Sequence, residues 1–204
     1  MSARRSATRA ILGAFVLACG GCSLLPRSTL PPDAQAAAPT SAQAFFLQGR
    51  LAVKYGDESL TGSLDWKHAP LRDELTLATP LGNDIARIVR TPQEVELVTA
   101  RQEIHRAATV EALTQQTLGW TLPLSDLSAW VRGRAAVGSE ATVARDASQR
   151  TTEIQQNGWQ VSYTYADAQS VQPRRIVLQL PESASRRPTL ELRLVIDDWK
   201  DPGQ

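Results

Sequence analysis

The residues that could catalyse a reaction or bind a metal are few and scattered along this chain of 204 residues. His68 and His105 are the two histidines, and each stands alone near the edge of a strand-like stretch, which favours surface positions over catalysis. The acidic pairs Asp57-Glu58 and Asp197-Asp198 are adjacent, so on a strand their side chains point to opposite faces. No nucleophile-elbow, zinc-protease, phosphate-loop or dinucleotide-binding motif occurs. The sequence therefore predicts a protein that is not an enzyme, with no catalytic residue, metal site or cofactor.

The two cysteines near the N terminus suit a different chemistry, the covalent attachment of lipid. Three arginines and no acids occupy the first ten residues, and the apolar run ILGAFVLA follows at 11–18. This run is too short to span a bilayer, which takes about 20 residues. A basic start, a short apolar run and small residues before a cysteine are typical of a bacterial lipoprotein signal peptide. The alternative is a buried core helix with incidental cysteines, which the terminal position and the linker-like sequence behind it disfavour.

Both cysteines follow a small residue, Ala18 or Gly21, so the third residue before each decides which is acylated; before Cys22 that residue is Cys19, which is unusual. Ala18 lies directly before Cys19 and Val16 lies three residues before it, which favours Cys19; Cys22 remains the alternative. The signal peptide then covers 1–18, or 1–21 in the alternative frame. Neither cysteine is followed by aspartate, which by analogy with enterobacterial sorting directs a lipoprotein to the outer membrane. A triacylated cysteine carries more than one chain, enough for stable anchoring.

Behind the anchor, residues 19–44 are rich in proline, alanine, serine and threonine, which predicts a semi-extended tether. Within and just beyond its end, residues 41–48 are expected to form a short helix. The folded domain is expected to cover 45–204.

Two short amphipathic helices are predicted between 109 and 133, where the chain otherwise shows strand patterns. Thr109 suits the N-cap of the first helix and Gly119 its C-terminal end. Pro123 suits the first turn of the second helix, and Gly133 ends the segment. Neither helix is long enough to be stable alone, so each must pack its apolar stripe against the β structure on either side.

Nine or ten antiparallel strands are predicted around this helical pair. Alternating apolar residues mark strands at 50–55, 60–66, 71–77, 85–89, 95–98, near 104, 151–156, 159–165, 176–180 and 190–196, and residues 135–148 are expected to be a loop. Asn157-Gly158 is a strong two-residue hairpin turn, and Gly62 inside a strand predicts a bend or a close approach. A sheet this large curls or closes. Its concave apolar face either holds an open cavity or is packed as core, and the pattern alone favours the packed core.

One loop, at 77–84, carries an apolar residue between two turn formers. Pro80 and Gly82 supply the turn, and Leu81 sits between them at the tip. Leu81 either folds back onto the core, as lone turn leucines commonly do, or forms an exposed apolar wedge that inserts into a membrane.

Seven stretches, in this order and spacing, resemble the LolB family of outer-membrane lipoprotein receptors, over nearly all of the domain. They are FLQGRLAV (46–53), GSLDW (62–66), LTLATPLGNDIARI (75–88), LGWTLPLSDLSAWVRG (118–133), NGWQVSY (157–163), PRRIVLQL (173–180) and LRLVIDDW (192–199). The resemblance implies a mainly β fold with an α lid: a single curved antiparallel sheet that forms an incomplete barrel, with short helices covering a hydrophobic cavity. It reverses the preference for a packed core.

The same resemblance implies a function in the bacterial envelope. The protein would accept lipoproteins from the soluble periplasmic carrier LolA and insert their acyl chains into the inner leaflet of the outer membrane, without nucleotide or metal. The expected localisation is the outer membrane, lipid-anchored and facing the periplasm, and a monomer is expected. Pro80, Leu81 and Gly82 are the candidates for membrane insertion. The candidates for the cavity lining are Leu64, Trp66, Leu75, Leu77, Trp120, Leu127 and Trp130.

Charge and composition limit the alternatives. Removing residues 1–18 leaves 19 basic and 21 acidic residues, about −2 in net charge. A nucleic-acid binder would need a basic stripe, so this charge argues against nucleic-acid binding. The main alternative is an envelope assembly-factor lipoprotein that binds folded partners through an exposed edge. A cell-envelope hydrolase ranks last, since no catalytic constellation is present.

Overall fold

A computed structural model describes residues 44–181 and 188–201, which form one antiparallel sheet with two short helices. The predicted signal peptide, most of the predicted tether, and both Cys19 and Cys22 lie outside the described residues. The elements in chain order are β1 (Phe45–Tyr55), β2 (Glu58–Ala69), β3 (Arg72–Ala78), β4 (Asp84–Arg90), β5 (Val95–Thr99), β6 (Ile104–Ala107), α1 (Val110–Leu118), α2 (Leu124–Trp130), β7 (Ala141–Arg145), β8 (Thr151–Gln156), β9 (Trp159–Thr164), β10 (Arg175–Leu180) and β11 (Leu190–Lys200).

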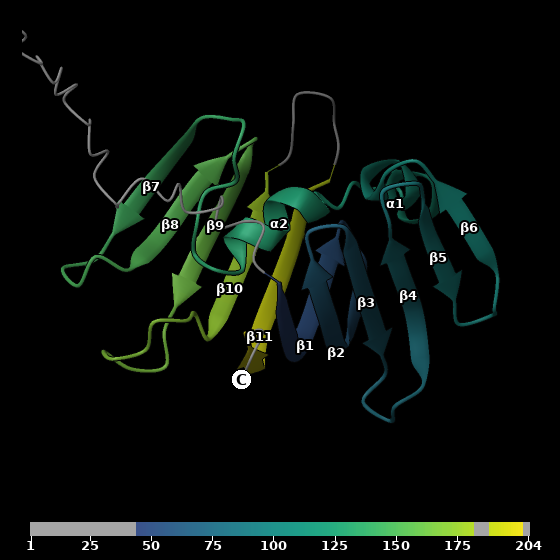
Figure 1. Ribbon diagram of the computed structural model, residues 1–204, viewed down its shortest axis with the longest axis horizontal. Coiled ribbons are helices and arrows are strands. Elements are labelled where there is room, and N and C mark those ends of the chain that lie inside the picture. The colour runs from purple at the N-terminus through teal and green to yellow at the C-terminus, as the bar shows by residue number, and fades with distance from the viewer. Residues whose placement is uncertain (1–43, 182–187, 202–204) are drawn as a thin grey trace, which may run out of the picture. The chain divides into compact units, whose positions relative to one another are not determined.

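The eleven strands form a single open sheet in the order β6-β5-β4-β3-β2-β1-β11-β10-β9-β8-β7. The first and last strands of the chain therefore pair at the centre, and β6 and β7 are the two free edges. In Figure 1 the strands turn progressively across the sheet, as the right-handed twist of strands requires. Helix α1 lies beside β5 and β6, and α2 lies over the middle of the sheet. The predicted fold class is confirmed: a mainly β, antiparallel, unclosed sheet with a helical cover.

Glycine allows β2 and β3 to approach each other closely. A Cβ on Gly62 would lie 2.5 Å from the carbonyl oxygen of Ala78 on β3, a separation that side chains do not tolerate. The predicted close approach at Gly62 is therefore present. At the far end of the sheet, Asn157 and Gly158 both have positive φ, 52° and 81°, as a two-residue hairpin turn demands.

Two predictions about the secondary structure are wrong. Residues from Phe45 to Gln48 do not form a helix; they begin β1, because Phe45 and Leu47 alternate with their neighbours and point into the core. The predicted loop at 135–148 contains β7. Only Ala141 and Val143 pack against the core there, both half-buried, so the apolar alternation is short and weak, and the backbone ladder to β8 completes the strand.

Candidate functional site

An apolar cavity of about 640 Å³ lies between α1 and the β1–β6 half of the sheet. Its apolar walls come from strand residues that alternate inward and from the segment that follows α1. These residues are Leu51, Val53, Leu60, Leu64, Leu75, Leu77, Ile85, Ala86, Ile88, Leu97, Leu118, Trp120 and Leu122. The cavity is open to solvent at one side, so it is a concave pocket and not a sealed void. This shape and lining are typical of a site for an apolar ligand.

Helix α1 covers the cavity, and its local sequence explains how it is held there. Thr109 accepts a hydrogen bond from the backbone N–H of Ala112 and caps the helix, and Gly119 ends it in the left-handed conformation at φ 77°. Val110 and Leu113 are buried under the helix, as the sequence pattern predicts. Thr114 Oγ1 accepts a hydrogen bond from the backbone N–H of Leu122, 2.9 Å away, which joins α1 to the segment that follows it.

Part of the cavity lining is polar. Arg101 and Glu103, in and beside the β5–β6 turn, line it together with His105 on β6. His105 is half-buried there, not fully on the surface as the sequence suggests. An apolar interior with polar groups in one part of the lining suits a ligand that has a long apolar chain and one polar end.

Four of the seven predicted cavity residues lie together in this lining: Leu64, Leu75, Leu77 and Trp120. The structure places the other three in the packed core outside the lining. Trp66 and Trp130 are fully buried, and each indole N–H donates to a buried acceptor, Asp73 Oδ1 and Gln156 Oε1 respectively, at 2.9 Å in both cases. Leu127 on α2 packs in the same core.

Sequence reasoning missed the contribution of β4 and β5. Ala86 and Ile88 on β4 and Leu97 on β5 line the cavity, and the ladders align Leu77 with Ala86 and Leu75 with Ile88 and then Leu97. The available signal was the alternation already used to predict these strands. Residues paired across a hairpin point to the same face of the sheet, so the cross-strand partners of Leu75 and Leu77 were predictable members of the lining.

The predicted loop residues form a tight turn between β3 and β4. The Gly82 N–H donates to the carbonyl oxygen of Thr79 at 2.9 Å, and the Thr79 N–H donates to that of Asn83 at 2.8 Å. Gly82 has φ 85°, and the Leu81 side chain between Pro80 and Gly82 is 89 % exposed. Leu81 therefore projects away from the core and does not fold back onto it. Its role at a membrane stays a prediction.

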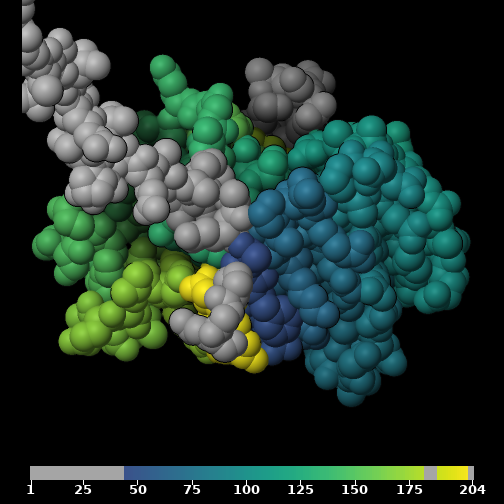
Figure 2. Space-filling model, viewed as in Figure 1, coloured from purple at the N-terminus to yellow at the C-terminus, as the bar shows by residue number. Residues whose placement is uncertain are grey.

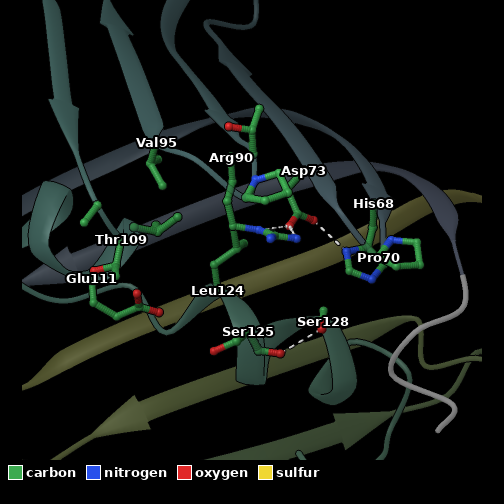
Figure 3. Close-up of a pocket in the computed structure, with 14 residues that line it drawn as sticks. His68, Pro70, Asp73, Arg90, Val95, Thr109, Glu111, Leu124, Ser125 and Ser128 are labelled. Carbon is green, nitrogen blue, oxygen red and sulfur yellow. Dashed lines mark hydrogen bonds and ion pairs between the residues drawn. The ribbon is translucent and has the colours of Figure 1, made fainter.

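A second cavity, of about 530 Å³, lies by the N-terminal ends of both helices and contains a buried charged cluster (Figure 3). Asp73 is central: its Oδ1 contacts His68 Nδ1 at 2.6 Å and Trp66 Nε1, and its Oδ2 accepts from Arg90 Nε at 2.6 Å. His68 is 7 % exposed, so the prediction of a surface histidine is wrong. The register aligns His68 with Asp73 across β2 and β3, which gives the imidazole a buried acceptor.

Burial raises the pKa of Asp73, but hydrogen bonds from His68 and Trp66 and the attraction of His68 and Arg90 outweigh it. The pKa of this carboxyl therefore lies below its ordinary value. A buried ionised carboxylate with this many donors stabilises one arrangement of strands β2, β3 and β4. We assign the cluster a structural role, since its donors and acceptors satisfy one another.

No helix within 44–181 and 188–201 is long and apolar enough to cross a membrane. Within the same ranges, no group of three or more histidine, cysteine or acidic side chains is arranged to hold a metal ion.

Comparison with known proteins gives one consistent family. The family model for outer membrane lipoprotein LolB matches residues 43–199. The outer-membrane lipoprotein LolB of Thiobacillus denitrificans is 38% identical over 192 residues, covering 94% of this chain and 96% of the relative. That of Nitrosomonas europaea is 40% identical over 160 residues, covering 76% and 72%, and that of Chromobacterium violaceum is 33% identical over 193 residues, covering 94% and 98%.

Two solved structures also resemble the chain. A DUF1329 family protein from Desulfovibrio piger has a TM-score of 0.48 at 7% identity and covers 80% of this chain and 88% of its own. A LolA superfamily protein from Nitrosomonas europaea has a TM-score of 0.46 at 10% identity, with the same coverage of 80% and 88%. The family match spans most of the described domain, including β1 to β10, both helices and nearly all of β11. This chain belongs to the LolB family of outer-membrane lipoproteins.

Proposed function

We propose that this protein receives lipoproteins in the outer membrane. It takes their acyl chains from the periplasmic carrier LolA into the apolar cavity and inserts them into the inner leaflet. The observation that carries the proposal is the open apolar cavity of about 640 Å³ under α1. Family membership supports the same role, because relatives that share 33 to 40% of their residues with this chain are outer-membrane lipoproteins LolB.

The energetics of acyl transfer fit a receptor that uses no nucleotide. Burying an acyl chain is worth about 0.8 kcal/mol per CH₂ group, so a lipoprotein does not cross water unaided at a useful rate. An acceptor whose cavity binds the chains somewhat better than the carrier draws them forward, and the bilayer binds them better still. The cavity volume also lies within the range of about 300–1,000 Å³ that is usual for ligands of drug size. A single saturated acyl chain is a guest of this size.

The anchor follows from the same proposal. Cys19, or Cys22 in the alternative frame, carries the lipid that holds the protein in the outer membrane, facing the periplasm. The tether at 19–44 lets the domain reach both an incoming carrier and the bilayer surface.

Replacing Leu81 by glutamate is expected to reduce delivery of lipoprotein into vesicles by about tenfold while binding of the lipoprotein is retained. Leu81 is 89 % exposed and makes few packing contacts, so the fold tolerates the change. A carboxylate, however, does not enter the hydrocarbon of the bilayer. The measurement follows a labelled lipoprotein from loaded LolA to the receptor and then to vesicles.

Leu71→Glu is the matched control, because Leu71 is also a turn leucine and is 69 % exposed, between β2 and β3. It is expected to deliver like the wild type. If Leu81→Glu delivers as fast as the wild type while binding normally, the insertion role of this loop is wrong.

A further inference from the structure

A pocket of about 450 Å³ at the β7–β9 side of the sheet is rich in arginine. Its lining includes four guanidinium groups, several hydroxyl and amide groups and, among the described residues, no carboxylate. The arginines are Arg132, Arg134, Arg145 and Arg150, and the hydroxyl residues are Ser148, Thr151, Tyr165 and Ser170. Guanidinium and hydroxyl donors are the groups that bind phosphate.

Two of the four arginines are already paired with nearby acids. Arg150 contacts Asp146 at 2.8 Å, and Arg132 contacts Asp201 at 3.4 Å. Both acids lie outside the pocket lining. Their charges reduce the positive potential of the pocket but leave it a cationic surplus.

The other two arginines supply that surplus. Arg145 donates only to neutral oxygens, the carbonyl of Gln149 at 3.0 Å and Thr151 Oγ1 at 3.3 Å. The side chain of Arg134 is exposed and makes no hydrogen bond or ion pair within the described residues. The pocket therefore presents two guanidinium groups that form no ion pair with a carboxylate of the described residues.

The same lining carries an exposed apolar residue. Val171, in the loop between β9 and β10, is 83 % exposed, which for a large apolar side chain has no structural benefit to the isolated domain. Basic residues beside an exposed apolar tip are the combination by which peripheral proteins contact a membrane surface: the cations attract anionic headgroups and the apolar tip enters the interface.

The position of this loop agrees with such a contact. The β3–β4 loop, which carries Leu81, and the β9–β10 loop, which carries Val171, belong to opposite halves of the sheet. In the view of Figures 1 and 2, both loops lie at the lower edge of the domain.

We propose that the arginine pocket and Val171 form a second membrane-docking surface that binds the phosphate of anionic phospholipid headgroups. It would act together with Leu81, so that the domain meets the bilayer at two points and the cavity is held in one orientation during delivery. The inference rests on the proposed delivery to a membrane and adds to it a lipid class and a second contact.

The test uses the lipidated full chain reconstituted into vesicles, with a fluorescent label on Val171→Cys and a quencher on the lipid headgroups. The cysteine of the pair Cys19 and Cys22 that is not acylated is absent or replaced by serine. Vesicles of phosphatidylcholine alone are compared with vesicles that also contain phosphatidylglycerol. Quenching is expected to rise with phosphatidylglycerol and to weaken with salt, because these contacts are exposed.

The variant Arg134→Glu/Arg145→Glu is expected to lower the affinity for phosphatidylglycerol vesicles, measured by the quenching, by about 30-fold or more, because two basic residues near an anionic surface are lost and two acidic ones are added. The neutral pair Arg134→Gln/Arg145→Gln should give an intermediate loss. Lys54→Glu/Lys67→Glu, a matched charge reversal at exposed positions on β1 and β2, should change the quenching less than twofold. Thermal unfolding of each variant confirms that the fold is kept.

Three results would overturn the proposal: quenching that does not depend on phosphatidylglycerol, equal losses in the arginine and lysine variants, or saturation of the pocket by free glycerophosphate without any vesicle contact. The last result would assign the site to a soluble anion. Binding of an acyl-chain probe and quenching of a label on Leu81→Cys, measured on the same samples, separate this proposal from the proposed function. If both persist while Val171 stays unquenched, only the second docking surface is lost.

Discussion

Replacing Ala86 by phenylalanine is expected to weaken binding of an acyl-chain probe about 100-fold. Ala86 lies on β4, half-buried, in the cavity lining between Leu77 and Thr99 on the neighbouring strands. A phenyl ring at this position occupies space in the cavity that the acyl chain of the probe would otherwise fill. Excluding three or four CH₂ groups from the cavity costs about 3 kcal/mol, since each contributes about 0.8 kcal/mol. The measurement is a titration of the protein with a fluorescent fatty-acid probe.

Ala144→Phe is the control for Ala86→Phe, because Ala144 is exposed on edge strand β7, away from the cavity lining. It should bind the probe like the wild type. Both variants must unfold at a temperature close to that of the wild type for the comparison to hold. Unchanged affinity in a folded Ala86→Phe protein would mean that the acyl chain binds elsewhere.

Replacing Asp73 by alanine is expected to lower the free energy of unfolding by about 3–5 kcal/mol, the usual cost of removing one partner from a buried ion pair. The change leaves Trp66 Nε1 and His68 Nδ1 without their acceptor and removes the partner of Arg90. Glu74→Ala is the matched control on the same strand. Glu74 pairs with Arg87, whose side chain is half exposed, so its loss should cost about 1 kcal/mol or less.

The pH dependence of unfolding tests the same cluster. Burial raises the pKa of Asp73, but the hydrogen bonds and charges around it lower the pKa below its ordinary value in the folded state. A carboxyl with a depressed folded pKa contributes stability that is fully present above its unfolded pKa, about 3.9, and is lost as the pH falls through the folded pKa. Denaturant titrations should therefore show wild type and Asp73→Ala converging below about pH 4. A stability difference that stays constant down to pH 2 would contradict this assignment.

Local signals explain why much of the fold is predictable from the sequence. Thr109 and Gly119 bound α1 because their side chain and conformational freedom satisfy the helix ends. Asn157-Gly158 fixes one hairpin because few other residue pairs adopt two successive positive φ angles. Apolar alternation identifies the strands that bury one face. It does not identify β7, where only Ala141 and Val143 are half-buried against the core and the apolar pattern is therefore short.

Whether a side chain points into the cavity or into the packed core depends on partners that are distant in the sequence. The sequence alone therefore does not predict every residue of the cavity lining. Trp130 lies in the core and not in the cavity lining, because Gln156, 26 residues away in the sequence, accepts a hydrogen bond from its indole N–H. Trp66 and His68 are buried because Asp73 pairs with both across a hairpin. Leu64 and Leu77, whose side chains have no polar atom to satisfy, lie in the cavity lining. Aromatic residues with a hydrogen-bond donor are thus the least predictable members of an apolar site.

The central claim is that acyl chains of lipoproteins occupy the cavity under α1. It is tested most directly with a lipoprotein that carries a photoreactive group within an acyl chain, transferred from LolA to the receptor and irradiated. The account predicts crosslinks to the cavity residues of β4, β5 and α1, including Ile88, Leu97 and Leu118, and their loss in Ala86→Phe. Crosslinks confined to the outer face of the sheet, or unchanged when the cavity is filled, would contradict it.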